Sequence, residues 1–297
     1  MLTIFYPDKI DQELLEKIDG TQTLRIGFAY YNTLRKSELW NSFIDKIREK
    51  TIRKLHFYVR LDKDESGQYI KSWGEIDFLE LVKGSSIDEI EIINAETLDN
   101  LWKITDVKTL SIRQAIKEKI SLLPIGNFTN SLERLYIEKN TTDLYALNNL
   151  KKLKLLNVTS IKLNATDICD LEIETLELVK STLVNAAAVN SMDSVEMISI
   201  YAQRGNDFSF LKMFPNLQSL VIDKCKALQD LSFIESLNTI EHITLENVPV
   251  IDNFSILHKL PNLKTFTHID SLNKPEDYLE LNKLNLEELN VYYKVKA

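Results

Sequence analysis

Histidines, cysteines and paired carboxylates are the residues of this sequence that could do acid–base or metal chemistry. The histidines are few: His56, His242, His258 and His268. His242, Thr244 and Glu246 alternate along one apolar–polar stretch, so they share one face of a predicted strand and are the nearest approach to an acid–base pair. Such pairs are common on exposed sheets. We therefore interpret this one as a surface pair, not a catalytic site.

The other reactive residues are not arranged for chemistry. His268 falls at a core position in "LKTFTHID", which predicts a local irregularity or a buried imidazole with its hydrogen bonds satisfied. Cys169 and Cys225 are too far apart for a shared metal, and Glu287 and Glu288 point to opposite faces of a strand. No phosphate-binding glycine motif occurs among seven glycines. We expect no catalysis, no cofactor and no metal.

Composition indicates a folded acidic protein. Hydrophobic residues make up 44% and charged residues 27% of 297 residues, and the formal net charge is −8. This charge disfavours nucleic acids and anionic lipid surfaces as partners. The N-terminus has no signal-peptide pattern, no stretch of 18 apolar residues occurs, and two cysteines form no disulfide framework. We expect a cytoplasmic protein, either one elongated domain or two compact ones.

A unit of the form apolar-x-x-apolar-x-apolar recurs along the chain. The middle apolar residues, spaced by 18 to 23 positions, are Leu135, Leu153, Leu176, Ile198, Leu220, Ile243, Phe266 and Leu289. Upstream the same unit recurs at longer and less regular intervals. One short alternating stretch per period predicts one strand per repeat, stacked into a parallel sheet.

These residues resemble leucine-rich repeats. The family pattern L-x-x-L-x-L-x-x-N/C-x-L is matched by "LQSLVIDKCKAL", with Cys225 at the N/C position, and by "LERLYIEKNTTDL", with Asn140 there. The period is similar to that of the short bacterial internalin-type repeats. The resemblance implies an α/β solenoid with a curved parallel sheet, a thin outer side and a general habit of binding proteins. Other residue types at most N/C positions indicate a broken asparagine ladder.

The second half of each period predicts the outer side of the solenoid. Aspartates that can cap a single helical turn precede short apolar runs, at Asp143, Asp207, Asp230 and Asp252. Longer amphipathic stretches, "KSELWNSFIDKIREK" with Ser37 as N-cap and "SWGEIDFLELVKG" with Gly84 as C-cap, predict true helices near the N-terminus. We expect one solenoid over 1–297: a cap and first irregular repeat (1–50), longer irregular repeats (51–130) and regular repeats (131–297).

The residues between the buried positions of each strand predict the inner, concave face. Two groups form the candidate partner-binding surface, a basic patch beside an apolar and aromatic one: Arg113, Arg134, Tyr136, Lys152, Lys154, Leu156, Val179, Met197, Tyr201 and Val221. Exposed apolar clusters rimmed by charge mark interaction sites, although Val, Tyr and Thr are also simply good strand formers.

We therefore predict a non-catalytic protein-binding module that holds its partner on the concave face. A narrower form is a bacterial immunity or inhibitor protein that neutralises a basic toxin or nuclease. One alternative is a scaffold that assembles through an open C-terminal edge, although Lys294 and Lys296 are the residue type that protects such an edge, which favours a monomer. An enzyme is the least favoured alternative.

Overall fold

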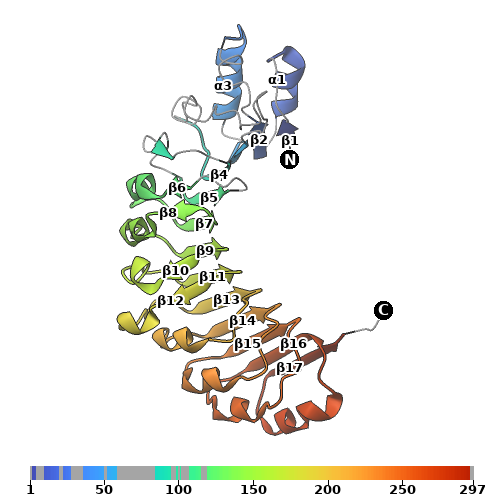
Figure 1. The fold of residues 1–297 in the computed structure, drawn as a ribbon. Coiled ribbons are helices and arrows are strands. Elements are labelled where there is room, and N and C mark those ends of the chain that lie inside the picture. The colour runs from blue at the N-terminus through green and yellow to red at the C-terminus, as the bar shows by residue number, and fades with distance from the viewer. Residues whose placement is uncertain are drawn as a thin grey trace, which may run out of the picture. The chain divides into compact units, whose positions relative to one another are not determined.

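A computed structural model describes residues 2–4, 10–19, 23–27, 36–49, 52–58, 84–94, 98–99, 101, 107–114 and 119–294 (Figure 1). The chain divides into two compact units, Met1–Leu153 and Lys154–Ala297, here called unit 1 and unit 2. Each contains one parallel sheet, with helices or short turns on its outer side.

Unit 1 combines two α-helices with the irregular repeats. Its described elements are β1 (Leu2–Ile4), α1 (Gln12–Ile18), β2 (Thr23–Gly27), α3 (Trp40–Arg48), β3 (Lys54–Tyr58), β4 (Glu89–Ile93), β5 (Thr109–Arg113), β6 (Ile120–Ser121), the 3₁₀-helix η3 (Leu123–Phe128), β7 (Arg134–Glu138), β8 (Thr141–Thr142) and η4 (Leu144–Asn149). The sheet order is β1-β2-β3-β4-β5-β7, and β6 pairs with β8 outside it.

Unit 2 repeats one strand and one 3₁₀-helix. Its described elements are β9 (Leu155–Thr159), β10 (Lys162–Asn164), η5 (Ala165–Asp167), β11 (Thr175–Val179), β12 (Thr182–Val184), η6 (Ala186–Ala188), β13 (Met197–Tyr201), η7 (Ser209–Met213), β14 (Ser219–Asp223), η8 (Ser232–Ser236), β15 (His242–Glu246), η9 (Ser255–Lys259), β16 (Thr265–Ser271), η10 (Pro275–Lys283) and β17 (Glu288–Tyr293). The sheet follows chain order from β9 to β17, and β10 pairs with β12 outside it.

The predicted repeat register is confirmed through most of unit 2. The middle apolar residues lie directly opposite one another on neighbouring strands and are almost fully buried: Leu176, Ile198, Leu220, Ile243 and Phe266. Stacking one strand per repeat in register buries a continuous apolar column, which is the principle of a repeat solenoid. The fold is therefore a leucine-rich-repeat fold of the α/β class, as predicted.

The α-helix predicted from "KSELWNSFIDKIREK" is confirmed. Phe43 and Ile47 of α3 are fully buried. The predicted N-cap is wrong: the N-cap is Leu39, without a side-chain cap, and Ser37 two residues earlier accepts a hydrogen bond from Leu39 N–H at 3.2 Å. The helix predicted around residues 73–82 lies outside the described residues. Gly84, its predicted C-cap, has φ of +75°, a conformation that favours glycine.

The register predicted for the repeat before β11 is wrong. The buried triple is Leu153-Leu156-Val158, whereas the prediction placed Leu153 in the middle of the strand. This repeat is rich in leucine, so two overlapping matches to the pattern exist. With Leu156 in the middle, the neighbouring spacings become 21 (156 − 135) and 20 (176 − 156) in place of 18 and 23.

The predicted aspartate caps are confirmed at two positions of four. Asp207 accepts a hydrogen bond from Ser209 N–H at 2.9 Å, and Asp230 accepts one from Ser232 N–H at 2.8 Å. Asn253, not Asp252, accepts the equivalent bond from Ser255 N–H at 2.7 Å. Asp143 has left-handed φ and accepts a bond from the Ser121 hydroxyl instead of capping η4.

The turns that leave the strands use the left-handed conformation at non-glycine residues. Values of φ from +49° to +66° follow strands at Asn94, Asn140, Ser160, Lys180, Ala202, Lys224 and Asn247. At the N/C position of the repeat, the Ser181 hydroxyl is 2.9 Å from the Val158 carbonyl, and the Cys225 thiol is 3.8 Å from the Ile200 carbonyl. These side chains connect each repeat to the one before it, although the asparagine ladder is broken.

The buried column predicts the effect of a core truncation. Leu220→Ala removes a side chain that is 1% exposed between two buried neighbours, so it should lower the free energy of unfolding by about 2 to 5 kcal/mol. Chemical denaturation followed by circular dichroism measures the loss. Ser219→Ala, on the half-buried inner face of the same strand, is the control and should change stability little. Equal stability of Leu220→Ala and wild type would contradict the register.

Candidate functional site

The inner face of unit 1 carries a chain of polar and charged side chains across four strands. His56 Nδ1 lies 2.6 Å from Glu91 Oε2, and Arg113 Nη1 lies 3.1 Å from Glu91 Oε1. Arg113 Nε lies 3.3 Å from Glu138 Oε1. These residues come from β3, β4, β5 and β7, so the contacts form only when the strands pair. Sequence reasoning missed the His56–Glu91 contact because 35 residues separate its partners.

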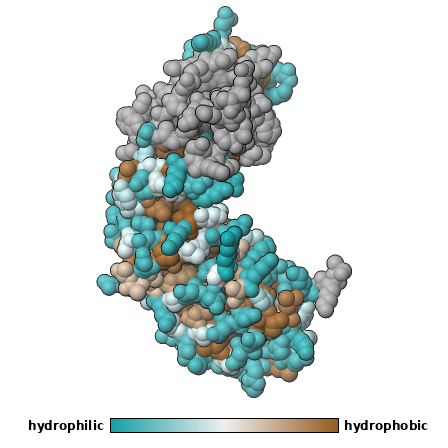
Figure 2. Space-filling model, viewed as in Figure 1, coloured by the Kyte–Doolittle hydropathy of each residue, from teal (hydrophilic) through white to brown (hydrophobic). Residues whose placement is uncertain are grey.

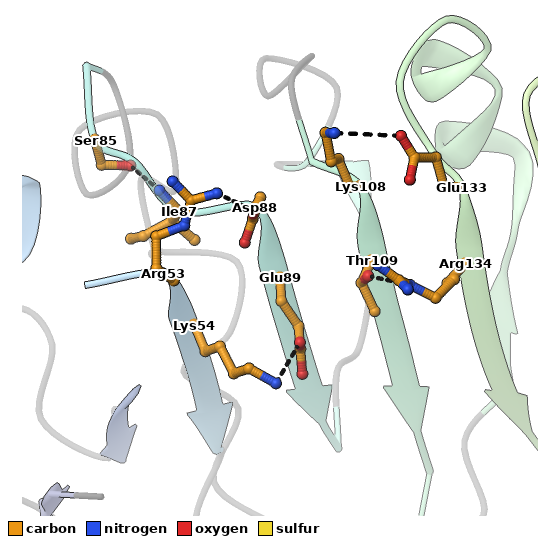
Figure 3. A network of polar contacts seen from close by, with 10 residues as sticks. All are labelled: Arg53, Lys54, Ser85, Ile87, Asp88, Glu89, Lys108, Thr109, Glu133 and Arg134. Atoms are coloured by element: carbon orange, nitrogen blue, oxygen red, sulfur yellow. Dashed lines mark hydrogen bonds and ion pairs between the residues drawn. The ribbon is translucent and has the colours of Figure 1, made fainter. Parts of the chain in front are cut away.

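Neighbouring positions of unit 1 add further cross-strand contacts (Figure 3). Arg134 Nε donates to the Thr109 hydroxyl at 3.2 Å, and Lys54 Nζ lies 2.7 Å from Glu89. Arg53 pairs with Asp88, and Lys108 pairs with Glu133 at 3.3 Å. The cations of this face therefore lie beside carboxylates or hydroxyls, and the predicted basic patch is not a concentration of uncompensated charge.

The placement of Lys152, Lys154 and Leu156 on the inner face is wrong. Lys152 and Lys154 precede β9, and Lys154 Nζ lies 2.9 Å from Glu174. Leu156 is fully buried in the core. The cause is the shifted register of this repeat, because a different register moves side chains between the two faces of a strand. The inner face of β9 carries Leu155, Asn157 and Thr159 instead.

The apolar part of the candidate surface lies in unit 2. Four predicted residues are half-buried on the inner face and, with Leu155, define the inner patch: Leu155, Val179, Met197, Tyr201 and Val221. Val179 lies directly opposite Tyr201, and Val221 lies opposite Ser199. The patch spans four adjacent strands, which corresponds to about 15 Å at the usual strand spacing. Arg113, Arg134 and Tyr136 belong to unit 1 and are not part of it.

Tyr201 is held in place by a polar neighbour. Lys224 Nζ lies 2.8 Å from the Tyr201 hydroxyl and 4.6 Å from the ring centroid. The hydrogen bond that Lys224 donates to the Tyr201 hydroxyl, followed by the nearby Asp223 carboxylate, raises the pKa of Lys224. Asn247 Nδ2 donates to Asp223 at 3.3 Å and to Glu246 at 3.2 Å. The inner patch therefore has a fixed aromatic residue beside an acidic rim of Asp223 and Glu246.

The pair suspected from the sequence has no acid–base geometry in its described contacts. His242 and Glu246 do share a face of β15, but His242 Nδ1 lies 2.9 Å from the Thr265 hydroxyl and Nε2 lies 3.8 Å from Glu241. Among the described residues, no group of three or more His, Cys, Asp or Glu side chains could hold a metal ion.

His268 is a buried imidazole at a local irregularity, because the register with β17 shifts between His268 and Ser271. The prediction that its hydrogen bonds are satisfied is only half right, since Nε2 has no hydrogen-bond partner among the described residues. The side chain is fully buried, and its Nδ1 lies 2.8 Å from the hydroxyl of Tyr278, which also contacts the Ser271 hydroxyl at 2.5 Å. Burial lowers the pKa of His268 to about 4 and raises the pKa of Tyr278 to about 12. Burial likewise raises the pKa of the Cys225 thiol to about 11, which makes it unreactive.

A cavity of about 570 Å³ lies between η7 and η8 of unit 2. Asp207, Asp230 and the rings of Phe208 and Phe233, stacked 4.8 Å apart, line it. The carboxylates cap the two 3₁₀-helices, so this cavity is explained by the construction of the repeats.

The comparisons with known proteins give only distant structural likenesses. No protein-family model and no curated protein matches the chain. Among solved structures, internalin C2 of Listeria monocytogenes is similar at 18% identity (TM-score 0.38, 86% of this chain and 83% of that one). Internalin F of the same organism is similar at 19% identity (TM-score 0.44, 84% of each chain). TLR13, solved in complex with a single-stranded RNA, is similar at 13% identity (TM-score 0.46, 95% of this chain and 51% of that one).

These likenesses are distant, so the fold assignment rests on the strand register described above. Within the part of the chain that the structure describes, no helix is both long and apolar enough to cross a membrane.

The burial of His268 predicts a specific pH dependence. Its pKa is about 4 in the folded state and about 6.5 in the unfolded state, so the unfolded chain binds an extra proton between these values. Stability should fall by about 3 kcal/mol from this residue as the pH decreases from 6.5 to 4. His268→Leu, the residue type found opposite it at Leu245, should lack this component.

Denaturation of both proteins at several pH values measures this component. The carboxylates titrate in both proteins, so their contribution cancels when the two stabilities are subtracted. Identical pH dependences for wild type and His268→Leu would show that His268 is not buried in its neutral form.

Proposed function

We propose that the chain is a non-catalytic protein-binding module and that its partner contacts the inner patch of unit 2. The observation that carries the proposal is the half-exposed position of Val179, Met197, Tyr201 and Val221 on adjacent strands, next to Asp223 and Glu246. Apolar and aromatic side chains with a charged rim are typical of protein interfaces.

Tyr201 is the expected anchor of the interface. Its ring is a large apolar group. Because the contact with Lys224 already restricts the side chain to few rotamers, Tyr201 loses less conformational entropy when a partner binds. Truncating an aromatic hot-spot residue in such a setting usually weakens binding by more than 1 kcal/mol. The partner therefore needs an apolar pocket or ridge that covers this ring.

The acidic rim and the net charge of −8 favour a partner with a basic surface. A narrower form of the proposal is an immunity or inhibitor protein that neutralises a basic toxin or nuclease in the bacterial cytoplasm. Its support is this electrostatic complementarity. Binding would then be fast at low salt and slower as salt increases, because steering between exposed charges is screened.

A catalytic role on the inner faces of the two units has less support than protein binding. The His56–Glu91 pair in unit 1 is the closest histidine–carboxylate contact among the described residues. Its side chains are only 14% and 12% exposed, so a substrate would have little access to it.

The proposal predicts the loss of one partner when the inner patch is made polar. Val179→Ser combined with Tyr201→Ser should weaken partner binding at least about tenfold and leave folding intact, because both side chains are half-exposed. Affinity purification from host lysate at low salt, with quantitative mass spectrometry, compares this variant with wild type.

Tyr145→Ser is the matched control, because Tyr145 is 57% exposed and belongs to η4 of unit 1. A protein retained by wild type and by the control, but lost from the inner-patch variant, is the expected result. Proteins captured equally by all three chains would argue against binding at the inner patch.

A further inference from the structure

The sheet of unit 2 has an open edge at β17. β17 is the last strand in the sheet order, so within the described residues its outer edge has no paired strand. Leu289 and Val291, at core positions of this repeat, are only half-buried, whereas Ile243 and Leu245 at the same positions two repeats earlier are almost fully buried. Figure 2 shows apolar surface in the region that β16 and β17 occupy in Figure 1.

The backbone of β17 offers hydrogen bonds at this edge in a fixed pattern. Directly before β17, Glu287 N–H donates to Lys264 O at 2.8 Å, and Glu288 N–H shares this acceptor at 3.3 Å. Lys294 N–H donates to Ser271 O at 3.0 Å, so from Glu288 onward the even-numbered residues direct their backbone groups toward β16. In a strand, alternate residues direct these groups to opposite sides. The N–H and C=O groups of Leu289, Val291 and Tyr293 therefore point to the open edge.

We propose that this edge pairs with the same edge of a second copy of the chain, as two antiparallel β17 strands related by a two-fold axis at Val291. This register places Val291 opposite itself and Leu289 opposite Tyr293 of the second copy. The backbone groups of all three residues point outward, as hydrogen-bonded antiparallel pairs require. Opposite residues share a face, so Leu289, Val291 and Tyr293 form an apolar row, and Tyr293 is already 44% exposed there.

The charges of β17 favour a second copy over an unrelated strand. The same register places Glu288 opposite Lys294 of the second copy, and the two-fold axis makes this ion pair twice. Edge lysines usually prevent unwanted pairing, because an incoming strand must bury or approach the charge. Here the sequence supplies its own opposite charge at the matching position, so the strand is complementary to itself when it runs antiparallel. A parallel arrangement would instead place like charges opposite each other.

The pairing is independent of the inner patch. It uses the end of the unit 2 sheet, whereas the inner patch lies on β9, β11, β13 and β14. A dimer of this kind would present two inner patches and could increase the avidity for a partner with two binding sites.

Charge exchange tests the proposed register. Sedimentation equilibrium of the wild-type chain, at physiological ionic strength and over a concentration series, should show a monomer–dimer equilibrium. Lys294→Glu and Glu288→Lys should each weaken the dimer about tenfold, because two ion pairs become like-charge contacts. The double variant Glu288→Lys/Lys294→Glu should restore the dimer, because the exchanged charges are again opposite.

A disulfide tests the two-fold axis directly. Two copies of residue 291 in a hydrogen-bonded pair would have Cα atoms about 5.5 Å apart, within the range that a disulfide spans. Val291→Cys, made together with Cys169→Ser to remove the half-exposed native thiol, should form a covalent dimer under mild oxidation. Thr267→Cys, on the inner face of β16, is the control and should not.

A wild-type chain that stays monomeric at every concentration would overturn the proposal. A dimer that the double charge exchange fails to restore, or equal cross-linking at residues 291 and 267, would overturn the antiparallel pairing at Val291.

Discussion

Burial of an apolar column between successive strands is the constraint on which the rest of the structure depends. In unit 2 each repeat contributes a strand whose middle apolar residue lies directly opposite that of the next, as Leu220 lies opposite Ile243. A single repeat cannot bury this side chain alone, so stability comes from stacking neighbours. Because the period along a strand is two, fixing the buried column also fixes which residues face outward. The candidate binding surface is a consequence of the core.

This dependence explains which features could be predicted from the sequence. Recurring apolar triples sufficed for the fold and for the inner positions of β11, β13 and β14, including Val179 and Tyr201. The prediction failed at β9, where neighbouring leucines match the pattern in two registers and only packing decides between them. One wrong register moved Leu156 from the core to the surface and left out Leu155.

Side-chain contacts between strands could not be predicted from the sequence, for a different reason. The His56–Glu91–Arg113 chain joins residues on three strands, and the irregular repeats of unit 1 give no fixed period from which to align them. The same holds for Tyr201 and Lys224, whose contact requires the left-handed turn at Lys224. Local patterns identified the positions of these side chains but not their partners. The prediction of a basic patch therefore missed the carboxylates that lie beside its arginines.

Site-specific photo-crosslinking can show whether the inner patch of unit 2 contacts a protein partner, as proposed. A photoreactive phenylalanine derivative at position 179 reports on the inner face, and the same group at position 212, an exposed lysine of η7, reports on the outer side of the same unit. If the inner patch binds the partner, irradiation in host lysate should join one discrete protein to position 179 and none to position 212. Cross-linking from position 212 alone, or equally from both positions, would contradict the proposal.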